Sequence, residues 1–171
     1  MRTFLSYCFL LSICIFQASF ASGETEAVFS PERSIKEILL KEVESTTSSI
    51  DLAVREITFP EMAQALVKAK DRGVKVRVIA DSKQAKMKSS QITYLIHQGI
   101  PVKVLRGKDD GVMNHRFAIL DSKKVVTGSF DWSEASEKWN YENIVIVRDN
   151  EVVASYQREF DRLWREKRVI R

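Results

Sequence analysis

The sequence predicts one α/β domain, in which helices cover both faces of a mixed β-sheet. Three observations lead to this prediction. Strand-like and helix-like segments alternate over the first two thirds of the chain that follows the N-terminal leader, which is the pattern of βαβ units. Two later strand-like segments, 116–120 and 124–127, are separated by only three residues. The sequence contains no internal repeat and no linker that would divide it into two domains.

Apolar periodicity and helix-breaking residues define the first elements. Apolar residues recur at helical spacing over 35–43, after a short apolar run that Pro31 interrupts. Residues 49–54 alternate as a strand does. A second amphipathic helix begins at Pro60 and ends before Gly73, because proline suits the first helical turn and glycine suits the position after the last.

The later elements follow the same rules. A glycine again closes a helix at Gly99, and a polar, lysine-bearing stretch over 82–90 separates that helix from the preceding strand. In order, the remaining predicted elements are a strand over 74–80, a helix ending at residue 98, strands over 101–105, 116–120, 124–127 and 144–147, and a final helix over 152–164.

Composition excludes several classes of protein. The 171 residues are 44% hydrophobic and 29% charged, with only 6 Gly and 3 Pro, which excludes collagen, low-complexity disorder and a multi-span membrane protein. The 27 Lys and Arg residues against 23 Asp and Glu residues give a net charge of +4. So small a charge does not by itself indicate a nucleic-acid-binding protein.

Residues 1–21 are predicted to be a signal peptide. Arg2 is followed by an apolar run over 4–16, and the small residues Ser19 and Ala21 occupy the two positions that a signal peptidase reads. The alternative is a retained membrane anchor, but the apolar run is shorter than the roughly 20 residues that a spanning helix needs. We therefore expect export to the periplasm or secretion.

The mature domain, 22–171, is then free of cysteine, because Cys8 and Cys14 both lie in the leader. It can form neither a disulfide nor a cysteine-based zinc site in an oxidising compartment. Its length of about 150 residues is sufficient for a full hydrophobic core.

The segment from Met113 to Trp132 is the part of the sequence that indicates chemistry. Its letters are MNHRFAILDSKKVVTGSFDW, and it resembles the signature of the phospholipase D superfamily, in which a His, a Lys, an Asp and the run Gly-Ser-x-Asn stand at fixed spacings. Asp121, Gly128 and Ser129 match that signature, whereas Asn114 stands at the histidine position, Arg116 at the lysine position and Asp131 at the asparagine position. Glu137, Asn140, Glu142 and Asn143 match the acidic and amide residues that follow it.

The resemblance covers nearly all of the mature chain, about 28–164. The Phe-Ser-Pro opening, the run Arg-Gly-Val-Lys-Val-Arg-Val-Ile and the run Gly-Ile-Pro-Val are similar to the small bacterial Nuc-type endonucleases. The resemblance implies a phospholipase D-like fold with one motif copy per chain. It also implies a phosphodiester substrate, either nucleic acid or a phospholipid headgroup.

The family mechanism, if it applies, brings two copies of the motif face to face. One histidine attacks phosphorus and forms a phosphohistidine, while the other protonates the leaving oxygen; the lysines, with Ser and Asn, hold the phosphate oxygens. This chemistry implies no metal and no cofactor. Because this chain holds one motif copy, the resemblance implies a homodimer with the active site across its two-fold axis.

Three motif positions differ from the family in ways that bear on catalysis. The Asn114 carboxamide has no lone pair basic enough to attack phosphorus or to carry a proton. Arg116 keeps the positive charge and can hold phosphate through two hydrogen bonds. Asp131 adds an anion that opposes phosphate, unless it pairs with Arg116 or is protonated.

His115 is the remaining candidate nucleophile, and it lies one residue away from the motif position. On a regular strand it points to the face opposite positions 114 and 116. A bulge after Gly111 would rotate it into the site. The alternative interpretation is a histidine that is hydrogen-bonded behind the motif strand.

Other candidates also have two interpretations. Ser129 either contacts phosphate or is an ordinary turn serine, and Glu142 either orients the histidine position, here accepting the Asn114 amide, or is a solvated charge at a strand edge. Asp121 is either part of the motif chemistry or a turn residue that fixes local geometry. Trp132 and Trp139 either stack on bases or pack in the fold. The cationic clusters over 83–88 and 103–108 either form a basic rim or are solvated surface.

Three functions are therefore compatible with the sequence. The first is an exported phosphodiesterase of the phospholipase D type, which requires His115 or another residue as nucleophile. The second is a non-catalytic phosphate-binding or interaction module that keeps the fold, the dimer and the residues Arg116 and Ser129. The third is a subunit that pairs with a histidine-bearing relative.

Overall fold

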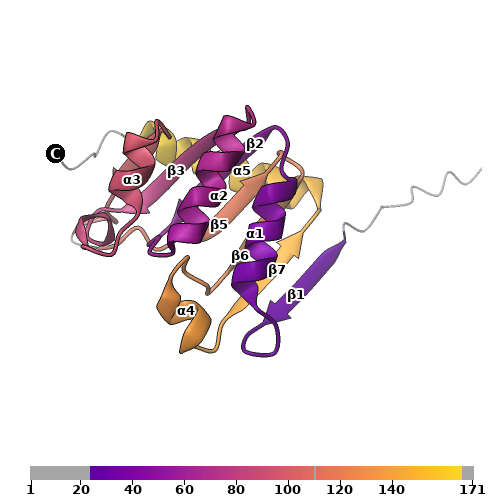
Figure 1. The fold of residues 1–171 in the computed structure, drawn as a ribbon. Helices are drawn as coiled ribbons and strands as arrows, with labels where there is room; N and C mark the ends of the chain where they lie inside the picture. The colour runs from indigo at the N-terminus through magenta and orange to yellow at the C-terminus, as the bar shows by residue number, and fades with distance from the viewer. Residues whose placement is uncertain (1–23, 110, 167–171) are drawn as a thin grey trace, which may run out of the picture.

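The structure, a computed structural model, describes residues 24–109 and 111–166. The predicted signal peptide, 1–21, lies outside the described residues. One seven-stranded sheet runs through the domain in the order β1-β7-β6-β5-β2-β3-β4 (Figure 1). The strands are β1 (Thr25–Phe29), β2 (Ser49–Val54), β3 (Lys75–Asp81), β4 (Val102–Leu105), β5 (Arg116–Leu120), β6 (Lys124–Gly128) and β7 (Asn143–Val147).

The sheet is mixed, as predicted. The pairs β2–β3 and β3–β4 are parallel, and the other four neighbouring pairs are antiparallel. The motif strand β5 lies between β6 and β2, so both of its edges are hydrogen-bonded. A central, doubly paired strand is a rigid base for a functional site.

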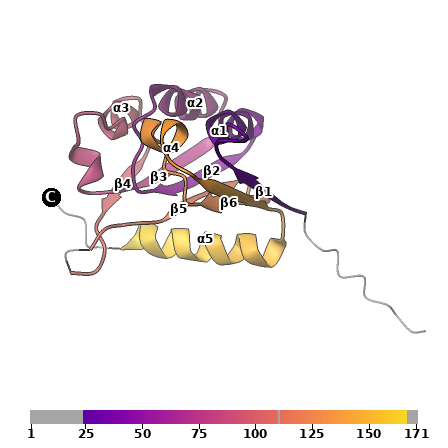
Figure 2. The same ribbon diagram turned by 90° about the horizontal axis from the view of Figure 1, so that it is seen from below.

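Helices cover both faces of the sheet, which confirms the predicted layers. Figure 2 shows α1, α2, α3 and α4 on one face and α5 on the other. The helices are α1 (Ile35–Ser45), α2 (Pro60–Asp71), the short 3₁₀ turn η1 (Gln84–Lys86), α3 (Ile92–His97), α4 (Glu134–Lys138) and α5 (Asn150–Arg165). Among the described residues, no helix is long and apolar enough to cross a membrane.

Local chemistry explains where the helices begin and end. The Ser34 side chain accepts a hydrogen bond from the backbone N–H of Glu37 and caps α1, and the Asp149 side chain caps α5 in the same way. Pro60 is the first residue of α2, and Gly73, just past its end, has a φ of 92°, which favours glycine.

Strand alternation gives the domain two cores. Along β5, Ala118 and Leu120 face the layer of α1 and α2, while Phe117 and Ile119 face α5. Phe160 of α5 is completely buried against this second set. Full burial of such side chains contributes about 1.5–3 kcal/mol each, so α5 is held to the sheet mainly by its apolar face.

Three short elements differ from the sequence prediction. Residues 25–29 form the edge strand β1, where the sequence indicated only a short apolar run. The helix α4 and the turn η1 were not predicted, because five and three residues are too short to show a periodicity.

Candidate active site

Two buried contacts fix the segment that leads into the motif strand. The carboxylate of Asp81, at the end of β3, is completely buried and accepts a hydrogen bond from the backbone N–H of Met113 at 3.0 Å. Its other oxygen accepts from the backbone N–H of Lys83 at 2.9 Å. β5 then begins at Arg116, which is paired with Val54 of β2. The motif residues therefore start from a defined backbone position.

Asp131, at the asparagine position of the motif, is held between two arginines. Its Oδ2 accepts hydrogen bonds from Nε and Nη2 of Arg55, at 2.9 and 2.6 Å, and from Nη2 of Arg116, at 3.0 Å. Nε of Arg116 lies 2.9 Å from Oδ1. The Asp131 side chain is only 4% exposed. These three residues, which we call the motif cluster, satisfy the expectation that Asp131 pairs with Arg116.

Arg55 is the residue of this cluster that sequence reasoning missed. It follows directly after β2, and the antiparallel pairing of Val54 with Arg116 brings it beside the motif. Arg55 also donates to Glu56 at 3.2 Å. Burial works against the charge on Arg55, but the hydrogen bonds and attraction of Asp131 outweigh it, so the pKa of Arg55 lies above its ordinary value.

Positive and negative charges are therefore equal in number at this site. The two guanidinium groups of Arg55 and Arg116 face the two carboxylates of Asp131 and Glu56. A phosphate oxygen that approaches Arg116 must compete with a carboxylate already bound through two contacts. The free positive charge that stabilises a phosphoryl-transfer transition state is therefore reduced at this position.

A second network holds Ser129. Its hydroxyl donates a short hydrogen bond to Oε2 of Glu142, and it accepts from the backbone N–H of Asn143 at 3.1 Å. The other oxygen of Glu142 accepts from Nδ2 of Asn140 at 2.9 Å. Glu142 is buried; its carboxylate accepts from Ser129 and Asn140 rather than from the Asn114 amide as expected, and its backbone N–H donates to the Ser30 hydroxyl.

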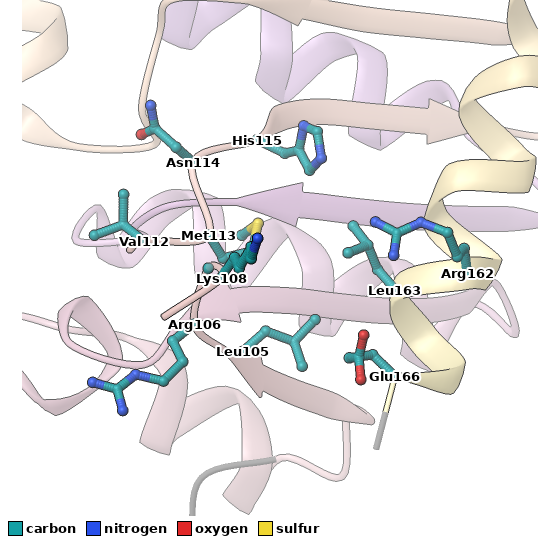
Figure 3. A pocket seen from close by; sticks show the side chains of 11 residues that line it. Leu105, Arg106, Lys108, Val112, Met113, Asn114, His115, Arg162, Leu163 and Glu166 are labelled. Atoms are coloured by element: carbon teal, nitrogen blue, oxygen red, sulfur yellow. The ribbon is translucent and has the colours of Figure 1, made fainter. Parts of the chain in front are cut away.

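Asn114 and His115 are neighbours in the loop before β5, but their side chains point in different directions (Figure 3). Asn114 is exposed, and its backbone carbonyl accepts a long hydrogen bond of 3.4 Å from Nη1 of Arg116. Of the two, Asn114 is the residue that the motif spacing places at the histidine position.

His115 faces α5. Its Nε2 lies 3.3 Å from Oε1 of Glu159, and its ring packs edge-on against Phe117 with 5.4 Å between the centroids. Strand alternation puts Phe117 on the α5 side of β5, opposite the motif cluster. His115 therefore has the position of a histidine hydrogen-bonded behind the motif strand, and the bulge that would rotate it into the site is not present.

Glu159 has a second partner on its own helix. Two hydrogen bonds from Arg162, both at 2.7 Å, are the main reason that the pKa of Glu159 lies below its ordinary value, and His115 adds to the effect. The carboxylate is therefore charged and holds both the guanidinium and the imidazole.

Asp121 lies at the far end of β5, about 17 Å along the strand from Arg116. It has a φ of 54° in the turn before β6. Its carboxylate accepts hydrogen bonds from the backbone N–H groups of Thr47, Ser48 and Ser49, at 2.6 to 3.1 Å. Although burial opposes it, this set of hydrogen bonds, with that of the Ser48 hydroxyl, keeps the pKa of Asp121 well below its ordinary value. Its contacts are those of a turn residue that fixes local geometry, so its placement among the catalytic candidates is not supported.

The tryptophans differ in environment. Trp132 is 4% exposed, and its backbone carbonyl accepts from the N–H groups of Thr58 and Phe59, so of its two interpretations the structure favours packing in the fold. Trp139 is 80% exposed. In the cationic clusters, Lys83, Lys86 and Lys88 are exposed, and Lys103 donates to the backbone carbonyl of Trp164.

No cluster of three or more His, Cys, Asp or Glu side chains in 24–109 and 111–166 has the arrangement of a metal site. The groups that the site offers are guanidinium, carboxylate, hydroxyl and amide. They can bind a phosphate ester, but none of the described residues contacting Arg116 and Asp131 is a strong nucleophile.

The fold and sequence match known proteins. Residues 39–164 match the family described as cardiolipin synthase, PLD-like domain. The structure is similar to a phospholipase D family member, Nuc from Salmonella typhimurium, with a TM-score of 0.78 and 27% identity over 88% of this chain and 99% of that one. It is also similar to NucT from Helicobacter pylori, with a TM-score of 0.75 and 26% identity over 84% of this chain and 96% of that one.

Curated relatives have the same domain within longer chains. The mitochondrial cardiolipin hydrolase of Xenopus tropicalis is 39% identical over 69% of this chain and 55% of its own length. A phospholipase D of Rickettsia conorii is 31% identical over 78% of this chain and 66% of its own length. This chain therefore spans only about half to two thirds of these relatives.

Proposed function

The chain belongs to the phospholipase D superfamily, and from this premise we propose that it is an exported domain that binds phosphodiesters without hydrolysing them through a phosphohistidine. Its ligand is a phosphodiester of a nucleic acid or of a phospholipid headgroup. It acts as a homodimer in which two copies of the motif meet, and it needs no metal or cofactor.

The observation that carries the proposal is the motif cluster. Covalent catalysis requires a nucleophile aimed at phosphorus and a cation free to hold the phosphate oxygens. The histidine position holds Asn114, and the cation position holds a guanidinium that Asp131 already binds. Loss of an acid–base group alone reduces rate by about 10²–10⁴-fold. Both deficits lie at the start of β5.

Binding remains chemically reasonable at this site. Nη1 of Arg116 makes only a 3.4 Å contact to the carbonyl of Asn114 and can turn to an anion. Ser129 lies beside it on the neighbouring strand end. Because the cluster is balanced in charge, we expect binding at the motif to be weak for one chain and to improve when two motif copies act together.

The sharpest test restores the family residues. The mature protein and the variant Asn114→His/Arg116→Lys/Asp131→Asn are assayed side by side on cardiolipin vesicles and on DNA, with acid-labile phosphoramidate trapping. We expect no turnover and no adduct from the native chain. The variant should hydrolyse at least one of the two substrates at a rate at least about 100-fold above the background measured with the native chain. Native binding should be measured on the same two ligands.

The matched control replaces both histidines, His97 and His115, with alanine. Native turnover that disappears with His115→Ala would contradict the proposal and favour a relocated nucleophile. Native turnover that survives the double replacement would contradict it in another way, by requiring different chemistry. Absence of both turnover and binding would leave an interaction module and would also overturn the proposal.

A further inference from the structure

A cleft of about 410 Å³ lies between α5 and the starts of β2 and β3, and its size suits a small ligand. Ser49 at the start of β2 lines it, about 17 Å along the strand from Val54, which pairs with Arg116 of the motif. Neither Asn114 nor any residue of the motif cluster lines this cleft. We call it the β2–α5 cleft, and its position separates it from the candidate active site.

Charged side chains line the β2–α5 cleft at positions where the sheet could continue its apolar core. Ala53 of β2 and Ile79 of β3 are buried in the core that α5 covers. Two residues earlier on each strand, and therefore on the same face, stand Asp51 and Arg77, which the parallel pairing places side by side. A buried ion pair usually stabilises a fold no more than apolar side chains of similar size would. The core alone therefore does not require these charges.

Arg77 and Asp51 are held in fixed positions in the cleft. Nε and Nη2 of Arg77 donate to Asp51 at 2.8 and 2.6 Å, and Nη2 also donates to Oδ1 of Asp161 on α5 at 3.1 Å. The guanidinium lies 4.8 Å from the centre of the Phe160 ring, and Gln157 of α5 donates to Asp51 at 2.8 Å. This part of the cleft is therefore already ordered, so a ligand would not pay for ordering it.

Two further charged groups of the cleft have capacity left for a ligand. The Lys75 side chain is exposed and forms no ion pair with a described residue. The Asp161 side chain is 38% exposed, and its Oδ2 accepts no hydrogen bond from a described residue. With Asp51 and Arg77, the charged residues that line the cleft are two cations and two anions. A ligand with one positive and one negative group matches both available charges and keeps this balance.

We propose that the β2–α5 cleft binds a small zwitterion, with the carboxylate of the ligand on Lys75 and its ammonium group on Asp161. The hydroxyl groups of Ser49 and Ser122, which also line the cleft, can bond to other polar groups of the ligand. None of the described residues that line the cleft is apolar, so it does not favour a lipid chain. The shared chemistry is that of a free amino acid or of a short peptide. This site does not depend on the function proposed for the motif.

The experiment titrates the purified protein with two zwitterions, L-serine and the dipeptide serylserine, and follows binding by calorimetry. Two analogues each lack one charge: N-acetylserine has no ammonium group, and serine amide has no carboxylate. We expect at least one zwitterion to bind with a Kd of about 1 mM or below. Each analogue should bind at least about tenfold more weakly than L-serine, because it loses a charged hydrogen bond. The tighter of the two zwitterions distinguishes a free amino acid from a peptide.

Variants at the two exposed charges place the ligand in the cleft. Lys75→Glu and Asp161→Asn should each weaken binding of the preferred zwitterion at least about tenfold. Lys123→Glu makes the same change of charge as Lys75→Glu, at an exposed lysine that does not line the cleft, and should have no effect. Lys75→Arg keeps the cation and should retain binding.

Failure of both zwitterions to bind would overturn the proposal, and so would analogues that bind as tightly as L-serine. Equal loss of binding in Lys75→Glu and Lys123→Glu would contradict the assigned site. Lys75→Glu and Lys123→Glu should bind phosphodiesters equally well, because neither residue belongs to the motif. Failure of the zwitterion site is therefore distinguishable from failure of the proposed function.

Discussion

Two aspartates of one motif lie near opposite ends of β5 and have opposite roles. At the far end, Asp121 matches the family signature and binds backbone N–H groups of the loop between α1 and β2. At the near end, Asp131 replaces the expected asparagine and binds the side chains of Arg55 and Arg116. One carboxylate fixes the backbone, while the other occupies the cations of the site.

This difference shows that one set of motif residues stabilises the fold and another set determines the chemistry of the site. The far end is determined by turn geometry and hydrogen bonds, and it agrees with the family. The near end is where Asn114, Arg116 and Asp131 all depart from the family. A chain can therefore keep the phospholipase D-like fold while its catalytic positions differ, because the two sets of residues contact different parts of the molecule.

The largest effect that would test this comparison is at Asp131. Asp131→Ala leaves two guanidinium groups, 30% and 20% exposed, without their buried anion. Breaking a buried pair costs about 3–5 kcal/mol, and we expect about 3 kcal/mol because both arginines are partly exposed. Chemical denaturation measures the loss, with Asp131→Asn as the control that keeps one acceptor. A loss under about 1 kcal/mol would mean that water already solvates these arginines.

Asp121→Ala should have the next largest effect. It removes the acceptor of the backbone N–H groups of Thr47 to Ser49 and puts alanine at a φ of 54°. We expect a loss of about 2 kcal/mol in the free energy of unfolding and no change in ligand affinity. A change in phosphodiester binding at unchanged stability would instead place Asp121 in the active site. Asp121→Asn, which tolerates the same φ, serves as the control.

The smallest expected effect is the pH dependence of the stability that Asp121 contributes at the far end of β5. The pKa of Asp121 is lowered in the folded state, so its contribution is complete above the unfolded pKa of about 3.9 and is lost as the pH falls below it. The difference in stability between the native chain and Asp121→Asn should therefore shrink between pH 5 and pH 2.5. Denaturation curves at stepped pH values measure it. A difference that stays constant would show that folding leaves the pKa of Asp121 unchanged.

Most of the fold was predictable because its elements are long or clearly bounded. The strand that ends at Asp81 and the helix from Pro60 have strong periodicity and clear breakers, and they were predicted within one or two residues. β1 and α4 could not be predicted as such, because each has five residues and depends on tertiary contacts. β1, for example, lies at the edge of the described sheet and is held there by its pairing with β7.

The candidate site was predictable only where the motif spacing determines it. Arg116, Ser129 and Asp131 were identified from spacing, and the pairing of Asp131 with Arg116 was anticipated on charge. Arg55 carries no local signal, because it reaches the motif only through the pairing of β2 with β5. The direction of His115 depended on whether the strand was regular, which alternation favoured.

The sheet ends at β1 and β4, and this has a consequence for how copies of the chain can associate. β4 has four residues and follows Pro101, and Lys103 within it is tied to the end of α5. β1 has five residues and carries Glu26, paired with Arg33 at 2.8 Å. Short borders with charged side chains resist the edge-to-edge addition of strands that leads to fibrils. These features of the two edge strands lower the tendency of copies of this protein to polymerise through their sheets.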